Sequence, residues 1–114
     1  MDAPHLLLGR KGERIACLFL LRQGFDVLVR RYRGRTGELD IVAFEHGTLV
    51  FVEVKTRTTT EFGQPWEFVD WRKQQTLRRT AEEFIAAYDL GQYPYRFDIV
   101  SVVGKEAALF RNAF

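Results

Sequence analysis

Asp40 and Glu53 are the two residues of this sequence whose types and spacing most clearly allow chemistry. Each lies in a short run of mostly β-branched and aromatic residues, and His46-Gly47 separates the two runs. Such runs predict two strands joined by a two-residue turn, which places Asp40 opposite Glu53. Facing side chains have Cβ atoms about 4.5–5.5 Å apart, where two like charges repel each other. A divalent cation between the carboxylates would turn that repulsion into attraction, and Mg²⁺ and Mn²⁺ prefer such oxygen ligands.

The predicted turn fixes the register of the two strands. Counting outward from it gives the facing pairs Glu45–Thr48, Phe44–Leu49, Val42–Phe51, Asp40–Glu53 and Glu38–Lys55. Side chains alternate between the two faces of a strand, so Lys55 projects from the same side as both carboxylates. Two carboxylates and a lysine at one place predict an active site.

The charged residues of these strands also have a purely structural interpretation, as a ladder of solvated ion pairs. The apolar residues, however, fall on both faces of the predicted strands. One face takes Val42, Phe44, Leu49 and Phe51, and the other takes Leu39, Ile41, Val50, Val52 and Val54. Strands that are apolar on both faces are covered on both sides, and charged groups are rarely buried there without a partner or a function. We therefore favour the active-site interpretation.

Four segments of the sequence resemble a known family. They are GERIA (12–16), GELDIVAF (37–44), FVEVKTR (51–57) and RFDIV (96–100). Asp40 followed by Glu53-x-Lys55 resembles the metal-dependent PD-(D/E)xK nuclease superfamily. The four segments together resemble, more narrowly, the YraN-like family of small bacterial endonuclease-like proteins, which is similar to archaeal Holliday-junction resolvases. The resemblance runs from about Gly9 to the C-terminus.

The resemblance implies an α/β fold with a restriction-endonuclease-like core, in the order αβββαβ, with a mixed sheet flanked by helices. Length and composition agree with one soluble globular domain over residues 1–114, because 46% of the residues are hydrophobic and 28% are charged. A net charge of +2 permits a nucleic-acid partner. One cysteine and the lack of a long apolar segment favour a cytoplasmic protein without a membrane partner.

A helix is predicted over the residues before Gly24, which should end it. Glu13 shares a helix face with Ala16, Cys17 and Leu20, so it should point toward the sheet with them. The residues leave two interpretations open, because an acidic residue near a helix N-terminus is also favoured by the helix dipole. The family resemblance implies that Glu13 joins the metal site.

A basic segment precedes the first carboxylate. Residues 25–30 predict a first strand, and residues 30–37 a loop that contains Arg31, Arg33 and Arg35. Arginines beside an active site suit contacts with phosphates, which give affinity without sequence information. A solubilising loop is the alternative; we favour phosphate contacts because the loop leads directly into the predicted site.

The second half of the chain predicts a loop over 58–66, a helix from the N-cap Asp70 to Tyr88, a strand over 96–103 and a short edge strand over 107–110. The later strand should lie parallel to its neighbour, because a helix connects the two. Lys73 lies on the apolar stripe of the predicted helix and should reach the sheet near the site. We also expect Arg57 and Lys73 to contact nucleic acid, and Asp98 to be structural.

The predicted mechanism is hydrolysis of phosphodiester bonds in DNA. Asp40 and Glu53 would hold Mg²⁺ or Mn²⁺, with the carbonyl of Val54 as a third ligand and Glu13 acting directly or through water. Lys55 would position the attacking water and counter charge on the phosphate. The resemblance suggests branched or junction DNA as substrate and a possible homodimer. Two alternatives stay open: a non-catalytic nucleic-acid-binding module on the same fold, and a structural adaptor.

Overall fold

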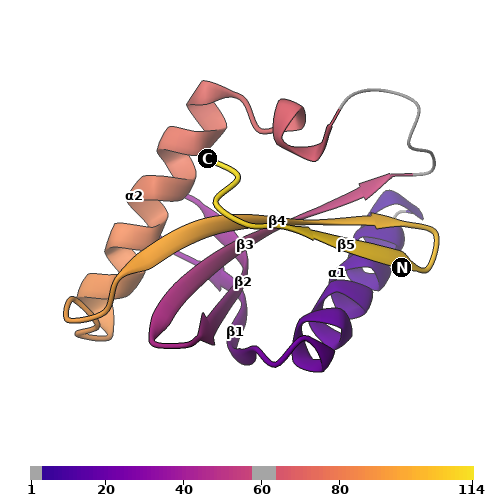
Figure 1. Ribbon diagram of the computed structural model, residues 1–114. Helices are drawn as coiled ribbons and strands as arrows, with labels where there is room; N and C mark the ends of the chain where they lie inside the picture. Colours follow the sequence, from indigo (N-terminus) through magenta and orange to yellow (C-terminus); the bar gives the residue numbers. More distant parts are fainter. Residues whose placement is uncertain (1–3, 58–63) are drawn as a thin grey trace.

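A computed structural model describes residues 4–57 and 64–114 of the chain. The elements follow in the order α1 (Pro4–Arg22), β1 (Asp26–Arg33), β2 (Glu38–Glu45), β3 (Thr48–Arg57), the 3₁₀ helix η1 (Pro65–Phe68), α2 (Trp71–Ala87), β4 (Tyr95–Val103) and β5 (Glu106–Phe110). This order contains the predicted αβββαβ core and adds one edge strand at its end (Figure 1).

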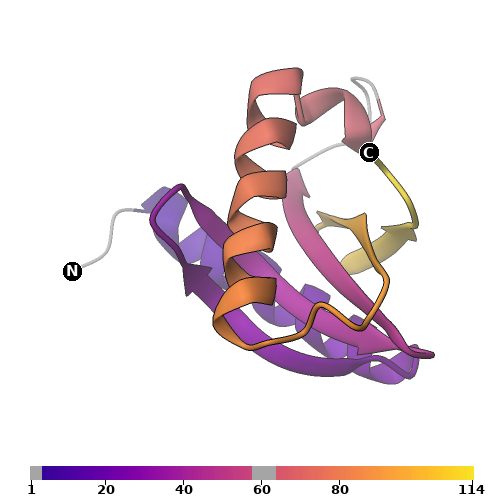
Figure 2. The ribbon, with the colours of Figure 1, turned by 90° about the vertical axis from the view of Figure 1, so that its left-hand side faces the viewer.

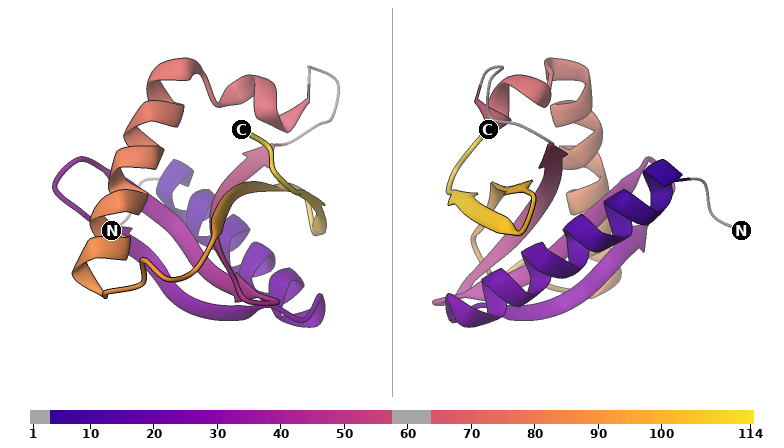
Figure 3. Two further views of the ribbon diagram at one scale, coloured as in Figure 1. Left: turned by 60° about the vertical axis from the view of Figure 1, so that its left-hand side comes forward. Right: turned by 90° about the vertical axis from the view of Figure 1, so that its right-hand side faces the viewer.

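The five strands form one mixed sheet in the order β1-β2-β3-β4-β5. Strands β3 and β4 are parallel, as the intervening helix predicts, and the other three pairs are antiparallel. The two helices cover opposite faces, with α2 in front of the sheet in Figure 2 and α1 in front in the right-hand view of Figure 3. The predicted α/β class, a mixed sheet flanked by helices, is therefore confirmed, and its arrangement is compatible with a nuclease-like core.

Each helix packs on its own apolar layer. On the α2 side the buried layer comprises Leu39, Val42, Leu49, Phe51, Val69, Leu77, Ala81, Phe84, Phe97 and Ile99. On the α1 side it comprises Ala16, Leu20, Phe25, Ile41, Ala43, Val50, Val52, Val100 and Val102. Strands β2, β3 and β4 contribute to both layers, so the centre of the sheet is covered on both faces, as its two-sided apolar sequence predicts.

The β2–β3 hairpin follows the predicted register near its turn. His46 and Gly47 have φ angles of 49° and 79°, the positive values that a two-residue type I′ turn requires at both positions. The predicted pairs Glu45–Thr48, Phe44–Leu49 and Val42–Phe51 all form. The ladder then ends at Ile41–Val52, one pair short of the predicted Asp40–Glu53 pair and before any Glu38–Lys55 pair.

Strand β1 corrects the predicted boundary between strand and loop. It continues through Arg33 instead of stopping at Arg30, because its last residues pair with the first half of β2. The prediction missed this because three arginines interrupt the apolar residues of this segment. Its apolar residues Val29 and Tyr32 pack against the buried layer on the α2 side. Glu38 pairs with Arg33 of β1. Leu39 lies in the α2 layer, whereas the predicted alternation put it on the same face as Ile41, which lies in the α1 layer.

Both helices end or begin as predicted. After α1, Gly24 has a φ angle of 95°, and the N–H of Phe25 donates to the carbonyl of Leu20, which is the hydrogen bond of a Schellman motif. At the start of α2, the side chain of Asp70 accepts a hydrogen bond of 2.9 Å from the N–H of Lys73. Of the predicted 58–66 loop, residues 58–63 lie outside the described residues, and Pro65 onward forms η1.

A second charged cluster, the Glu45–Asp98 cluster, lies where β2, β4 and the C-terminal residues meet. Arg96 donates to Glu45 at 2.7 Å and to Asp98 at 3.0 Å, and Arg111 donates to the other oxygen of Glu45 at 3.0 Å. The N–H of Asn112 donates to the fully buried Asp98 at 3.0 Å. Each carboxylate therefore has charged or backbone donors, which agrees with the structural role predicted for Asp98.

Candidate active site

The candidate active site lies where β2 and β3 separate. If the hairpin ladder continued, the N–H of Val54 would donate to the backbone carbonyl of Leu39, because hydrogen-bonded pairs alternate along antiparallel strands. Instead, it donates to Oδ2 of Asp40 at 2.8 Å. The carboxylate of Asp40 thus takes a place that a backbone carbonyl would otherwise hold, and it lies between the two strands.

The separation brings the carboxylates of Asp40 and Glu53 together. Burial, followed by the hydrogen bond and the negative charge of Glu53, raises the pKa of Asp40 to about 8. The side chain of Glu53 is only 6% exposed. Asp40 and Glu53 line a small void of about 10 Å³ together with Leu39, Phe51 and Leu77, so apolar side chains adjoin the carboxylates. Ionising both of these carboxyl groups costs free energy unless a cation lies nearby.

Two lysines supply positive charge to these carboxylates. Lys73, from the first turn of α2, forms an ion pair with Oε2 of Glu53. Lys55, two residues after Glu53 on β3, lies close enough to interact with Lys73 and with both carboxylates. Burial, followed by the charge of Lys73, lowers the pKa of Lys55. The structure therefore places Lys55 and Lys73 beside the two carboxylates.

Glu13 stands beside this cluster and has a partner of its own. Its charge contributes to the raised pKa of Asp40, so it is within electrostatic reach. Its Oε2 accepts a hydrogen bond of 2.7 Å from Nε of Arg31, which has a φ angle of 56°. Arg31, predicted to bind phosphate, thus pairs with the carboxylate predicted to bind metal. Its left-handed backbone, uncommon for a non-glycine residue, has no signal in the sequence.

Gly12 sets how close α1 comes to β3, and so where Glu13 lies. A Cβ atom built at Gly12 would collide with Oγ1 of Thr56 and would lie 3.2 Å from its Cβ. No larger residue fits this contact unless the helix or the strand moves. The sequence shows the glycine, but it predicts only a weakened helix and not a close approach.

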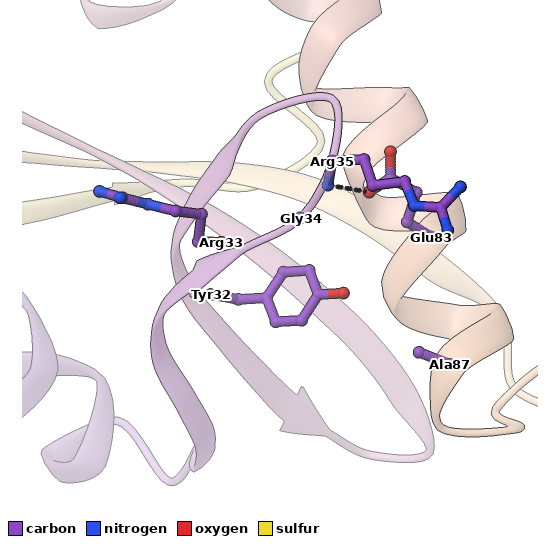
Figure 4. Close-up of a pocket in the computed structure, with 6 residues that line it drawn as sticks. All are labelled: Tyr32, Arg33, Gly34, Arg35, Glu83 and Ala87. Carbon is purple, nitrogen blue, oxygen red and sulfur yellow. Dashed lines mark hydrogen bonds between the residues drawn. The ribbon is translucent and has the colours of Figure 1, made fainter.

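The basic segment holds its arginines differently from the prediction. The turn between β1 and β2 is tied to α2, because Glu83 accepts hydrogen bonds from the N–H of Arg35 at 2.8 Å and of Thr36 at 3.0 Å. Figure 4 shows this contact at the edge of a shallow hollow of about 660 Å³, with Arg33 pointing away from Glu83. Arg33 is 82% exposed, and its guanidinium lies 3.9 Å from Glu38. The segment is a strand end followed by a docked turn, so the backbone that carries Arg33 and Arg35 is held in place.

The structure gathers some of the predicted site residues and not others. It brings together Asp40, Glu53, Lys55 and Lys73, with Glu13 and Arg31 as an adjoining pair. Arg57 is half-buried and donates to Oγ of Ser101 at 3.3 Å, while Arg33 and Arg35 lie on the β1–β2 connection. Across residues 4–57 and 64–114, no group of three or more acidic, histidine or cysteine side chains is arranged to hold a metal ion.

Comparison with known proteins identifies the family of this chain. The Uncharacterised protein family UPF0102 matches residues 12–102, and the chain belongs to this family, which is the YraN family. A UPF0102 protein of Alkaliphilus metalliredigens is 43% identical over 110 residues, covering 94% of this chain and 96% of the relative. One of Caldicellulosiruptor bescii is 48% identical over 97 residues, covering 83% and 81%. The resemblance of the four segments to the YraN-like family is therefore confirmed as family membership.

In the described part of the chain, no helix has the length and apolar character needed to cross a membrane.

Proposed function

We propose that this protein is a metal-dependent endonuclease that hydrolyses phosphodiester bonds in DNA. The observation that carries the proposal is the pair of carboxylates, Asp40 and Glu53, placed together with Lys55 at the opening between β2 and β3. A structural cluster would give every carboxylate guanidinium or backbone donors, as the Glu45–Asp98 cluster does. We expect branched DNA to be the preferred substrate and the activity to be cytoplasmic.

The donor set fits a magnesium or manganese ion. Asp40 and Glu53 offer carboxylate oxygens that already lie close to each other, and repulsion between them would be relieved by a divalent cation. Magnesium commonly binds through one or two carboxylates and takes its other ligands from water and phosphate, so two carboxylates suffice. Bound there, the ion would supply Lewis-acid polarisation of a phosphate oxygen.

The remaining residues of the cluster have distinct tasks in this proposal. Lys55 lies within electrostatic reach of both carboxylates, on the same strand as Glu53, so it can orient water and stabilise negative charge developing on the phosphate. Its lowered pKa, caused by burial and by Lys73, makes its proton easier to give up. Glu13 would support the site through its charge on Asp40, with Arg31 holding it in place.

A non-catalytic nucleic-acid-binding module is the second candidate. The observation that favours it is the ion pair between Lys73 and Glu53, which neutralises one carboxylate without metal. In that case the cluster would be a polar contact surface, and the exposed Arg33 would contribute affinity through phosphate contacts. Binding without cleavage would decide for this candidate.

The test is a cleavage assay on junction, flap, nicked and linear DNA with Mg²⁺ or Mn²⁺. Asp40→Ala, Glu53→Ala and Lys55→Ala should each lower the rate by at least about 100-fold, because each removes a charged group from the reacting centre. Glu13→Gln should have a smaller effect, since Glu13 adjoins the carboxylate pair. Thermal melts should show that all four variants fold.

Glu38→Ala is the matched control. It makes the same kind of change on β2, two residues before Asp40, but its side chain is exposed and lies near Arg33. It should cleave at nearly the wild-type rate. A variant of Asp40, Glu53 or Lys55 that also cleaves at that rate would show that the residue has been given the wrong role.

A further inference from the structure

Lys73 places a positive charge directly against one of the two facing carboxylates. Its Nζ is paired with Oε2 of Glu53, whose side chain is almost fully buried, while the side chain of Lys73 itself is 43% exposed. A buried carboxylate without a partner is costly, so this ammonium group stabilises Glu53. It comes from a helix and not from the strands that carry Asp40 and Glu53, so it can move independently of them.

The local surroundings of Lys73 otherwise disfavour its charge. It is the third residue after the N-cap Asp70, in the first turn of α2, where the partial positive charge of the helix terminus repels a cation. Lys55 lies beside it, and the charge of Lys73 is the second cause, after burial, of the lowered pKa of Lys55. Against the effect of burial, Glu53 raises the pKa of Lys73, with smaller contributions from Lys55 and Asp40, so the attraction of Lys73 to the site comes mainly from a carboxylate that would also attract a metal ion.

We propose that Lys73 is a tethered cation that competes with the divalent metal for Glu53. It neutralises Glu53 when no metal is bound, and the metal displaces it. The inference rests on the proposed function, because it assumes that Asp40 and Glu53 form the metal site. It adds a role that a phosphate contact alone would not give: Lys73 lowers the affinity of the site for free metal.

Displacement would also link metal binding to substrate binding. A lysine side chain has four flexible methylene groups, and Lys73 is already half-exposed, so its ammonium can turn toward solvent while the helix stays in place. Once displaced, the ammonium lies beside a bound cation that repels it and near the place where DNA phosphates would lie. A phosphate would then be its nearest attractive partner, so DNA should favour the metal-bound state.

The experiment measures Mn²⁺ binding without DNA, by the EPR signal of free Mn²⁺ at pH 8 and low salt. Lys73→Met keeps the length of the side chain and removes its charge. It should bind Mn²⁺ about tenfold more tightly than wild type, equivalent to about 1.4 kcal/mol. Arg72→Met is the matched control, because it removes the same charge from an exposed neighbour in the same helical turn. It should stay within about twofold of wild type, since exposed charges at a distance are screened.

Metal affinity separates this inference from a structural role. If Lys73 only supported the fold, its loss would weaken Mn²⁺ binding or leave it unchanged, and either result would overturn the proposal. Lys73→Gln gives a second uncharged variant should Lys73→Met fold poorly, and Lys73→Arg, which keeps the charge, should not bind metal more tightly than wild type. Melting in chelator should show Lys73→Met less stable than wild type, because Glu53 loses its partner.

Asp40→Asn distinguishes the failure of this inference from that of the proposed function. If Asp40→Asn weakens Mn²⁺ binding but Lys73→Met does not strengthen it, the metal site stands and the tethered cation is wrong. If neither wild type nor Lys73→Met binds Mn²⁺ in a manner sensitive to Asp40→Asn, both proposals fail.

Discussion

Two groups of carboxylates lie in the same sheet, and the pKa values of one member of each, Glu45 and Asp40, are shifted in opposite directions. In the Glu45–Asp98 cluster, two arginines and a backbone N–H donate to the carboxylates. Burial opposes the charge of Glu45, but Arg96 and Arg111 together hold its pKa below the usual value. At the β2–β3 opening, Asp40 faces Glu53, and burial together with that neighbour raises the pKa of Asp40 to about 8. Both groups contain largely buried carboxylates, so burial alone does not tell them apart.

The difference lies in how the charges are balanced. Arginines with several fixed donors bind the first group in one geometry, which suits a role in stability. Lysines, whose side chains are flexible, balance the charge of the second group. Each ammonium group could move away without breaking a backbone hydrogen bond. Asp40 and Glu53 repel each other beside two flexible lysine side chains, so a further cation could bind between them. This contrast with the Glu45–Asp98 cluster supports the proposed active site.

The largest expected effect on stability comes from breaking the Glu45–Asp98 cluster. Arg96→Ala should lower the free energy of unfolding by about 3 kcal/mol, because it leaves two buried carboxylates with fewer partners. Arg33→Ala is the control; its guanidinium is 82% exposed and 3.9 Å from the nearest carboxylate, so the change should stay below about 0.5 kcal/mol. Chemical denaturation measures both. Equal losses would remove the distinction between clusters and surface pairs.

A smaller effect tests the repulsion at the opening. Asp40 keeps a proton in the folded protein up to about pH 8, whereas the unfolded chain releases it near pH 4. Since the folded state binds the extra proton between these values, the free energy of unfolding should fall as the pH rises from about 4 to about 8. Asp40→Asn should remove this loss and, in chelator at pH 8 to 9, should be more stable than wild type by about 1 kcal/mol.

The same melts, repeated with Mg²⁺ or Mn²⁺, test the ligand assignment. Wild type should gain stability, because a ligand that binds only the folded state stabilises it, and Asp40→Asn should gain much less. Asp26→Asn, an exposed carboxylate on β1, should respond to pH and metal like wild type. Equal metal responses in wild type and Asp40→Asn would show that Asp40 is not a ligand.

The smallest expected effect concerns the arginines of the β1–β2 connection. Replacing Arg33 and Arg35 with alanine should weaken DNA binding for every sequence tested. It should also reduce the slope of log affinity against log salt by about 2, since each phosphate contact contributes about 0.9. A double alanine variant of Arg22 and Lys105, both exposed and outside the site, controls for net charge. An unchanged slope would show that the two arginines are only solvated.

Local patterns predicted most of the fold and the centre of the site. The two-residue turn fixed the hairpin register as far as Val42–Phe51, and the N-cap at Asp70 placed Lys73 at the first turn of α2. These predictions need only strand alternation or helical periodicity, which neighbouring residues encode. The facing of Asp40 and Glu53 came from the same alternation, although the ladder itself stops one pair earlier.

The missed features depend on contacts between distant parts of the chain. Arg31 and Glu13 are 18 residues apart, and Glu83 holds the backbone of Arg35 across 48 residues. No periodic pattern joins such positions, because the tertiary packing of helices on the sheet brings them together. The extension of β1 was missed for a related reason: pairing with β2, and not an apolar run, keeps its arginines in a strand.

The contact between Gly12 and Thr56 has a consequence for how this site could change in evolution or by design. A single methyl group on Gly12 would act as a wedge between α1 and β3. It would carry Glu13 away from Asp40 while leaving Asp40, Glu53 and Lys55 on their own strands. The distance of the third carboxylate from the other two could thus be changed by the size of one residue that is not itself a reacting group.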